Sequence, residues 1–89
     1  INNSTFELKD LSPNPVSEQA NIQFVSSNSE DIIFSIYNLL GREVYSKRIR
    51  AVRGLNTLNI NTSNYSEGIY LYSINNKMEV KTKRMIVRE

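Results

Sequence analysis

The chain has 89 residues, of which 39% are hydrophobic and 22% are charged, and its formal net charge is +2. This is the composition of an ordinary single globular domain, and it excludes wholesale disorder. Because the sequence contains neither cysteine nor histidine, it excludes disulfide bonds, thiolate zinc sites and the Ser-His-Asp and Cys-His catalytic arrangements.

Short runs rich in valine, isoleucine, threonine, tyrosine and phenylalanine follow one another along the chain, separated by asparagine, glycine, serine and proline. No segment keeps apolar residues at helical spacing for more than a turn, so the pattern predicts strands. The expected strands lie at residues 5–11, 20–26, 31–38, 43–50, 56–61, 69–75 and 79–88. Strands of this length and spacing predict an all-β fold, a β-sandwich of about seven strands.

Most of these strands carry apolar side chains at every second position, which gives each of them one face toward a core. The residues expected on these faces are Phe6, Leu8, Ile22, Phe24, Ile32, Phe34, Ile36, Leu58 and Ile60. Residues 43–50 alternate poorly, because Lys47 shares a face with Tyr45 and Ile49. An inward charge of this kind is typical of an edge strand, where it deters pairing with other chains.

The segments between the strands are marked by proline and glycine. In Pro13-Asn14-Pro15 the proline rings favour extended neighbours, so we expect a stiff link that cannot join a central ladder. Gly41, Gly54 and Gly68 all fall between predicted strands, where a residue that tolerates positive φ is useful. Asn75-Asn76-Lys77 leaves room for little more than a tight turn, which predicts a hairpin.

The sequence GIYLYSI at residues 68–74 poses the question of whether its tyrosines form a ligand platform or belong to the core. Extended, it places Tyr70 and Tyr72 on one face and Ile69 and Leu71 on the other. Both faces are largely apolar, which favours a central strand with core tyrosines. Tyr70 is then placed to act as a tyrosine corner, with its hydroxyl bonded to the chain upstream.

Little in the sequence points to catalysis or to a cofactor. The adjacent acids Glu30 and Asp31 are typical of a solvated turn, and neither a calcium-loop spacing nor a glycine-rich phosphate loop occurs. Residues 42–53 carry five bases and residues 77–89 another five. Only Tyr45 interleaves with them, whereas nucleic-acid platforms need several exposed rings. We therefore expect no enzyme, metal, cofactor or nucleic-acid partner. The chain also lacks the apolar run that a membrane-inserted helix requires.

Several short motifs between Leu11 and Glu89 occur in the order and spacing of a known pattern. They are Pro13-Asn14-Pro15, Ile36-Tyr37-Asn38, Gly41-Arg42, Gly54 with Asn56, Gly68-Ile69-Tyr70, and Lys83-Arg84-Met85-Ile86-Val87. With these motifs the chain resembles the type A C-terminal sorting domain of the type IX (Por) secretion system of Bacteroidetes bacteria. It departs from the pattern at Asn38, where many members have aspartate, and in the hairpin at residues 75–77, which lacks glycine.

The resemblance implies an immunoglobulin-like antiparallel β-sandwich at the C-terminus of a larger cargo protein. Residues 1–10 would join the cargo and contribute a first strand, residues 11–89 would form the sorting domain, and the Pro-Asn-Pro link would hold the domain off its cargo. The machinery would recognise the domain in the periplasm and direct the cargo across the outer membrane. A sortase-like peptidase would then remove the domain, leaving the cargo on the cell surface or released.

The resemblance also implies which residues define the fold and which are recognised by the machinery. Its fold-defining motif maps to Pro13, Asn14, Pro15, Gly41, Arg42, Gly54, Gly68 and Tyr70. Recognition by outer-membrane components of the machinery would use the last strand, namely Lys81, Lys83, Arg84, Met85, Ile86, Val87 and Arg88. Here charge would steer the partner, apolar groups would contact it, and an edge strand would allow β-augmentation.

Two rival functions stand against the sorting role, although the sequence favours neither. One is a carbohydrate-binding or adhesive sandwich of a surface protein, and the other is a nucleic-acid binder that uses residues 42–53. Exposed edge strands would also let an isolated domain form a homodimer.

Overall fold

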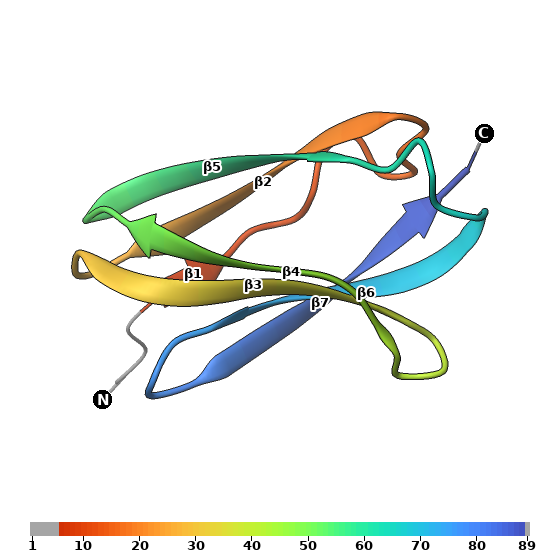
Figure 1. Ribbon diagram of the computed structural model, residues 1–89. Coiled ribbons are helices and arrows are strands. Elements are labelled where there is room, and N and C mark those ends of the chain that lie inside the picture. Colours follow the sequence, from red (N-terminus) through yellow and green to blue (C-terminus); the bar gives the residue numbers. More distant parts are fainter. Residues whose placement is uncertain (1–5, 89) are drawn as a thin grey trace.

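The computed structural model describes residues 6–88, which form seven strands and no helix (Figure 1). The strands are β1 (Phe6–Leu8), β2 (Gln19–Ser26), β3 (Glu30–Asn38), β4 (Glu43–Ala51), β5 (Gly54–Asn61), β6 (Gly68–Asn75) and β7 (Val80–Val87). Within this described part, no helix is long and apolar enough to cross a membrane. The expected cargo junction at residues 1–5 and the terminal Glu89 lie outside the described residues.

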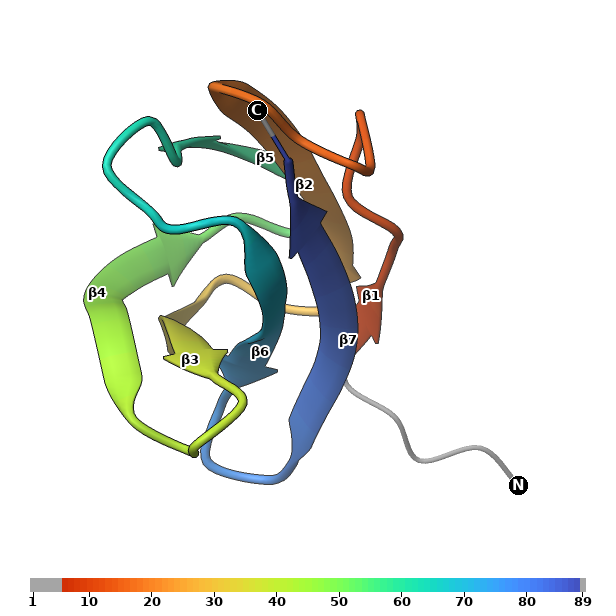
Figure 2. The ribbon, with the colours of Figure 1, turned by 90° about the vertical axis from the view of Figure 1, so that its right-hand side faces the viewer.

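The strands form two antiparallel sheets that pack face to face (Figure 2). One sheet has the order β1-β2-β5 and the other has the order β4-β3-β6-β7. This is the immunoglobulin-like arrangement with the fourth strand placed beside the third. The predicted fold is therefore confirmed.

All seven predicted strands are present, and six of them agree with the prediction to within two residues at either end. The first was expected to reach residue 11 but ends at Leu8. Beyond it the chain still follows β2 irregularly, because Ser12 and Asn21 exchange two backbone hydrogen bonds of 2.9 and 2.8 Å. Residues 6–10 thus belong to the sandwich itself.

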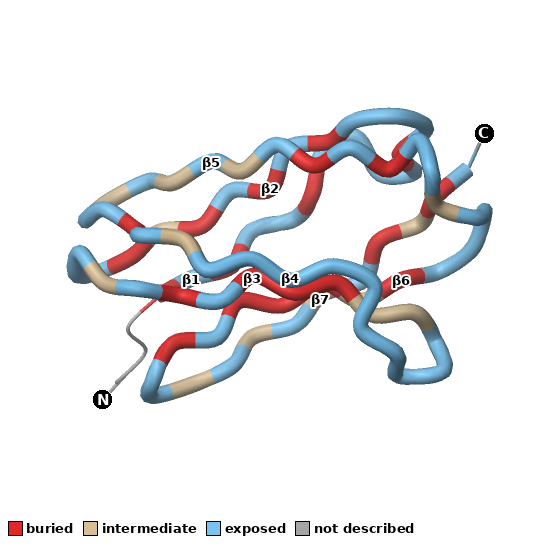
Figure 3. The backbone as a smooth tube through the Cα atoms, viewed as in Figure 1, coloured by how far each residue is buried: buried red, intermediate tan, exposed pale blue. Residues whose placement is uncertain are grey.

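The hydrophobic core lies between the two sheets and is built from the predicted inner faces (Figure 3). Phe24, Phe34 and Tyr72 are its largest fully buried side chains. Burying a large apolar side chain stabilises the fold by about 1.5–3 kcal/mol, so the alternating pattern carries much of the fold. Leu58, expected in the core, is half-buried at the margin.

Strand β6 answers the question raised by GIYLYSI. It lies between β3 and β7, and its inner face buries Tyr70, Tyr72 and Ile74 in the core. The residues are therefore core tyrosines of a central strand, as predicted. β6 and β7 form the expected hairpin, and the side chain of Asn76 closes their turn by accepting hydrogen bonds from Met78 N and Glu79 N.

Strand β4 is the edge strand that its sequence predicted, and most of its side chains are exposed. The edge strands at the other side of the sandwich are β1 and β7, which lie beside one another in Figure 2. The sandwich thus has two open sides, one between β1 and β7 and the other between β4 and β5.

Candidate functional site

The last strand, β7, was predicted to carry the recognition residues, and its side chains alternate between the core and the surface. Met85 and Val87 point into the core and are 0% and 2% exposed. Arg84 and Arg88 are exposed, and Ile86 is half-buried on the outer face of the sheet. Of the predicted apolar contact residues, only Ile86 is therefore accessible to a partner of the folded domain.

The two predicted lysines of β7 are engaged within the domain. Lys81 Nζ donates a hydrogen bond of 2.6 Å to the carbonyl oxygen of Phe6, and it lies 5.3 Å from the centre of the Phe6 ring. Lys83 Nζ lies 3.0 Å from Asp10 Oδ1. The lysine side chains thus bridge the two sheets and close the open side between β1 and β7.

The Pro13-Asn14-Pro15 segment covers the outer edge of β7. Asn14 Oδ1 accepts a hydrogen bond of 3.0 Å from Ile86 N, and Asn14 Nδ2 donates one of 3.4 Å to the carbonyl of Arg84. Val16 N then donates to the carbonyl of Ile86 at 2.8 Å, and Arg88 N donates to the carbonyl of Val16 at 2.9 Å. The segment pairs with β7 as a short neighbouring strand would, and we call it the β7 clamp (residues 13–16).

This clamp differs from the stiff spacer that the sequence predicted. The prolines do keep the segment out of a central ladder, but the chain lies against β7 and forms part of the sandwich. The clamp also occupies the edge groups of β7 from Arg84 to Arg88. In the folded domain, this half of β7 therefore offers no free edge for β-augmentation.

Next to the exposed residues of β7, the outer face of the sheet carries apolar side chains. The pairing register places Arg84 opposite Leu71, Leu71 opposite Tyr37, and Ile86 opposite Ile69. Side chains that are opposite one another on neighbouring strands lie close enough to contact. They form a mixed basic and apolar surface at the end where β7 finishes.

The β3–β4 turn, at the same end of the sheet, carries two exposed leucines that the sequence analysis did not single out. Leu39 and Leu40 are 66% and 92% exposed, and they directly follow Asn38 at the end of β3. Two adjacent leucines in a predicted turn could have indicated an exposed apolar surface, because a turn has no core in which to bury them. We group these outer-face residues and the two leucines at this end of the sheet as the terminal patch, and its residues are Tyr37, Leu39, Leu40, Ile69, Leu71, Arg84, Ile86 and Arg88.

The Gly41-Arg42 motif shapes the turn that presents these leucines. Gly41 has a φ of 84°, a conformation that side-chain-bearing residues rarely adopt. Asn38 Oδ1 accepts hydrogen bonds of 3.0 Å from both Leu40 N and Arg42 N. An aspartate oxygen would accept the same bonds, which explains why the departure at Asn38 leaves the turn intact.

The Gly54 and Asn56 pair has a similar role in the β4–β5 link. Gly54 has a φ of 100°. Asn56 Oδ1 accepts a hydrogen bond from Val52 N, and Asn56 Nδ2 donates one to the carbonyl of Val52, both at 2.9 Å. The side chain of Asn56 thereby fixes the point at which the chain crosses from one sheet to the other.

The two core tyrosines of β6 tie the last hairpin to distant parts of the chain. Tyr70 OH donates a hydrogen bond of 2.7 Å to the carbonyl of Ser66, so the predicted tyrosine corner is present. Tyr72 OH accepts one of 2.9 Å from Leu11 N and donates one of 3.2 Å to the carbonyl of Lys9. Burial raises the pKa of Tyr72, and the hydrogen bond from Leu11 N opposes part of that shift.

Comparison with known families assigns nearly the whole chain to one family. A family model described as the secretion system C-terminal sorting domain matches residues 10–88 of the chain. The matched range includes the β7 clamp, both glycine turns, the tyrosine corner and β7. A search of curated proteins finds no match.

Proposed function

Because the chain belongs to the family of secretion system C-terminal sorting domains, we propose that the secretion machinery reads its folded sandwich at the terminal patch. The domain is a C-terminal sorting signal for type IX secretion, and it directs a fused cargo across the outer membrane. The carbohydrate-binding alternative is not favoured by this family membership.

The observation that carries the proposal is the exposure of arginines beside apolar side chains at one end of the sheet. Arg84 and Arg88 are exposed there, and Leu40 is almost fully exposed in the β3–β4 turn at the same end of the sheet. The arginines would steer an acidic partner surface toward the domain, and the apolar side chains would supply contact area. Lys81, Lys83, Met85 and Val87 would instead act indirectly, by holding β7 in place.

The stages of export form the finer part of the proposal. The patch would first meet outer-membrane components of the machinery on their periplasmic side, and a sortase-like peptidase would later separate domain and cargo at the cell surface. Because β1 pairs with β2, a cut that leaves the sandwich intact would fall before Phe6. The domain itself would perform no catalysis, and pairing of isolated domains through exposed edges stays a prediction.

A secretion assay with charge-reversed variants tests the terminal patch. The chain is fused behind a periplasm-directed reporter and expressed in a type IX-competent strain and in a secretion-defective one. We expect the unaltered fusion to reach the medium or cell surface only in the competent strain, and the double variant R84E/R88E to stay in the periplasm. The matched control is R53E/K77E, which reverses two exposed charges outside the patch and should be secreted normally.

Charge reversal tests the terminal patch more specifically than truncation of the last strand does. Deletion of residues 85–89 should also trap the reporter, but it removes the buried Met85 and Val87 and so destroys core packing together with the patch. Normal secretion of R84E/R88E would contradict the recognition surface proposed here. Equal export from both strains by the unaltered fusion would contradict the sorting role of this chain.

A further inference from the structure

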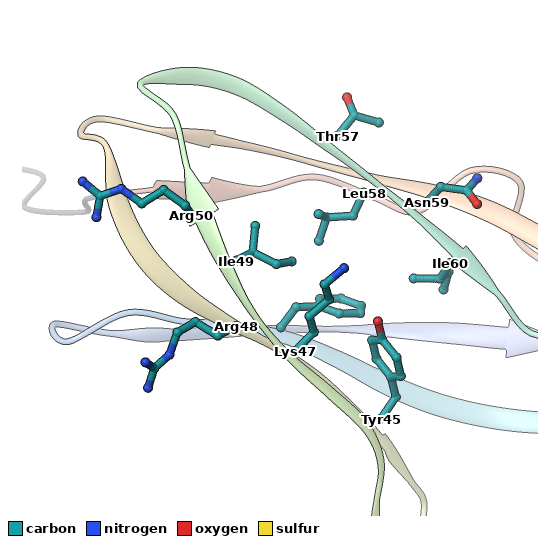
Figure 4. Close-up of a pocket in the computed structure, with 10 residues that line it drawn as sticks. Tyr45, Lys47, Arg48, Ile49, Arg50, Thr57, Leu58, Asn59 and Ile60 are labelled. Atoms are coloured by element: carbon teal, nitrogen blue, oxygen red, sulfur yellow. The ribbon is translucent and has the colours of Figure 1, made fainter.

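The second open side of the sandwich, between β4 and β5, forms a groove (Figure 4). The two strands belong to different sheets, and each is paired only on its other side, β4 with β3 and β5 with β2. The groove has a volume of about 380 Å³, and the side chains of Tyr45, Lys47, Ile49, Leu58 and Ile60 face into it. We call it the β4–β5 groove.

This side lacks the closing contacts found between β1 and β7. There, lysine side chains and the β7 clamp join the two sheets. Across the groove, no hydrogen bond or ion pair joins the described residues of β4 to those of β5. Ile49 and Leu58 pack against the core but stay only half-buried. The groove therefore exposes the apolar side chains of Ile49 and Leu58 at the margin of the core. It also exposes the unpaired edges of β4 and β5.

The groove has one sign of charge. Three bases, Lys47, Arg48 and Arg50, contribute to its walls, and no aspartate or glutamate does. Figure 4 shows the Lys47 side chain rising into the groove, whereas Arg48 and Arg50 point away from it. Arg50 is already paired with Asp31 at 3.3 Å. Lys47 is thus the charge that any occupant of the groove must accommodate.

Lys47 selects among occupants by its charge. An apolar strand that covered the groove would bury an ammonium group without a partner, which is unfavourable. A carboxylate opposite Lys47 would remove that penalty, while its apolar neighbours would cover Ile49 and Leu58. A second copy of this chain would bring its own Lys47, Arg48 and Arg50, so pairing between β4 edges is opposed by like charges.

We propose that the β4–β5 groove binds an extended acidic segment of a partner protein, independently of the terminal patch. In such a segment, residues two positions apart share a face. The face toward the groove would carry one acidic residue opposite Lys47, with apolar residues two positions before and after it. The groove continues into a hollow of about 250 Å³ lined by Tyr45, Ile60 and Tyr65, which would accept one of these apolar residues.

Binding of a designed peptide to the full 89-residue chain tests the inference. The probe is a fluorescent synthetic peptide with the core Val-Thr-Glu-Thr-Val, and its matched control replaces the glutamate with lysine. We expect fluorescence anisotropy to show tighter binding of the glutamate peptide. The variant K47E should weaken that binding about tenfold or more and should favour the lysine peptide instead. K77E, an exposed charge reversal in the β6–β7 turn, should bind as the unaltered chain does.

A neutral variant at Lys47 and a map of the peptide-binding site complete the test. Lys47 is exposed, so K47E and K47Q should fold, which circular dichroism verifies, and K47Q should bind with intermediate strength. The glutamate peptide should shift the backbone amide signals of Ile49 and Leu58. Equal affinity for the two peptides, unchanged binding by K47E, or shifts confined to β7 would each overturn the proposal.

Discussion

The amide oxygen of Asn14 accepts a hydrogen bond from the backbone N–H of Ile86, which lies 72 residues later in the chain. The amide nitrogen of the same side chain donates to the carbonyl of Arg84. One asparagine therefore satisfies two backbone groups of the terminal strand. This relationship links the first sequence motif of the domain to the last one, and it makes the edge of β7 depend on the β7 clamp.

Replacement of Asn14 with alanine should destabilise the domain and open the edge of β7. Both hydrogen bonds are lost, so we expect the free energy of unfolding to fall by about 1–2 kcal/mol. The backbone amide of Ile86 should also exchange with solvent faster. Denaturant unfolding and amide hydrogen exchange measure the two effects.

Asn59 offers a matched control for this change. Its side chain is exposed and bonds only to the exposed side chain of Asn21 in the described structure. N59A should therefore change the free energy of unfolding by less than about 0.5 kcal/mol. Equal losses in N14A and N59A would show that the contact between clamp and strand contributes nothing specific.

Much of the fold was predictable from the sequence because a strand reveals its buried face through local alternation. Phe24 and Ile22, or Phe34 and Ile32, need no distant partner to be recognised as core residues. The direction of Lys81 and Lys83 was not predictable in the same way. Whether a lysine on an edge strand points to water or bridges two sheets depends on Phe6 and Asp10, far away in the sequence.

The β7 clamp and the cross-strand neighbours of Arg84 in the terminal patch escaped prediction for the same physical reason. The proline rule states what Pro13 and Pro15 exclude, which is a central ladder position, but not which edge the segment covers. The patch is assembled across strands, since Tyr37, Leu71 and Arg84 become neighbours only through the sheet register. By contrast, the tyrosine corner was predictable, because Tyr70 and Ser66 are only four residues apart.

Replacement of Tyr70 with phenylalanine should weaken the tyrosine corner without changing the core volume greatly. The hydroxyl donates to the carbonyl of Ser66, and its removal should lower the free energy of unfolding by about 1–2 kcal/mol. Y37F serves as the control, because Tyr37 is half-buried and its hydroxyl has no hydrogen-bond partner among the residues that the structure describes. A loss in Y37F as large as that in Y70F would contradict this role of Tyr70.

Stability should fall at alkaline pH through the buried Tyr72 and the half-buried Tyr65. Burial raises the pKa of Tyr72 above its ordinary value of 10.0, and it does the same for Tyr65. Well below pH 10 both the folded and the unfolded chain keep these protons, so stability does not depend on them. As the pH rises through 10, the unfolded chain loses its phenolic protons first, and the free energy of unfolding decreases.

Denaturant unfolding at a series of pH values on both sides of 10 measures this dependence. Y72F should be less stable than the unaltered chain at neutral pH, because Leu11 N loses its acceptor. Its stability should nevertheless decline less steeply above pH 10. An identical slope in the two proteins would exclude Tyr72 as a source of the alkaline effect.

Variants at Met85 and Leu40 should separate the effect of folding on secretion from the effect of recognition. Met85 is completely buried, so M85A should lower the free energy of unfolding by about 2–5 kcal/mol. Leu40 is 92% exposed, so L40S should change it by less than about 0.5 kcal/mol. If the machinery contacts the terminal patch, L40S should still reduce secretion of a reporter fusion, even though its domain is as stable as the original. Secretion and denaturant unfolding are measured for the same variants. Normal secretion of L40S together with failed secretion of M85A would remove the leucine turn from the recognition surface.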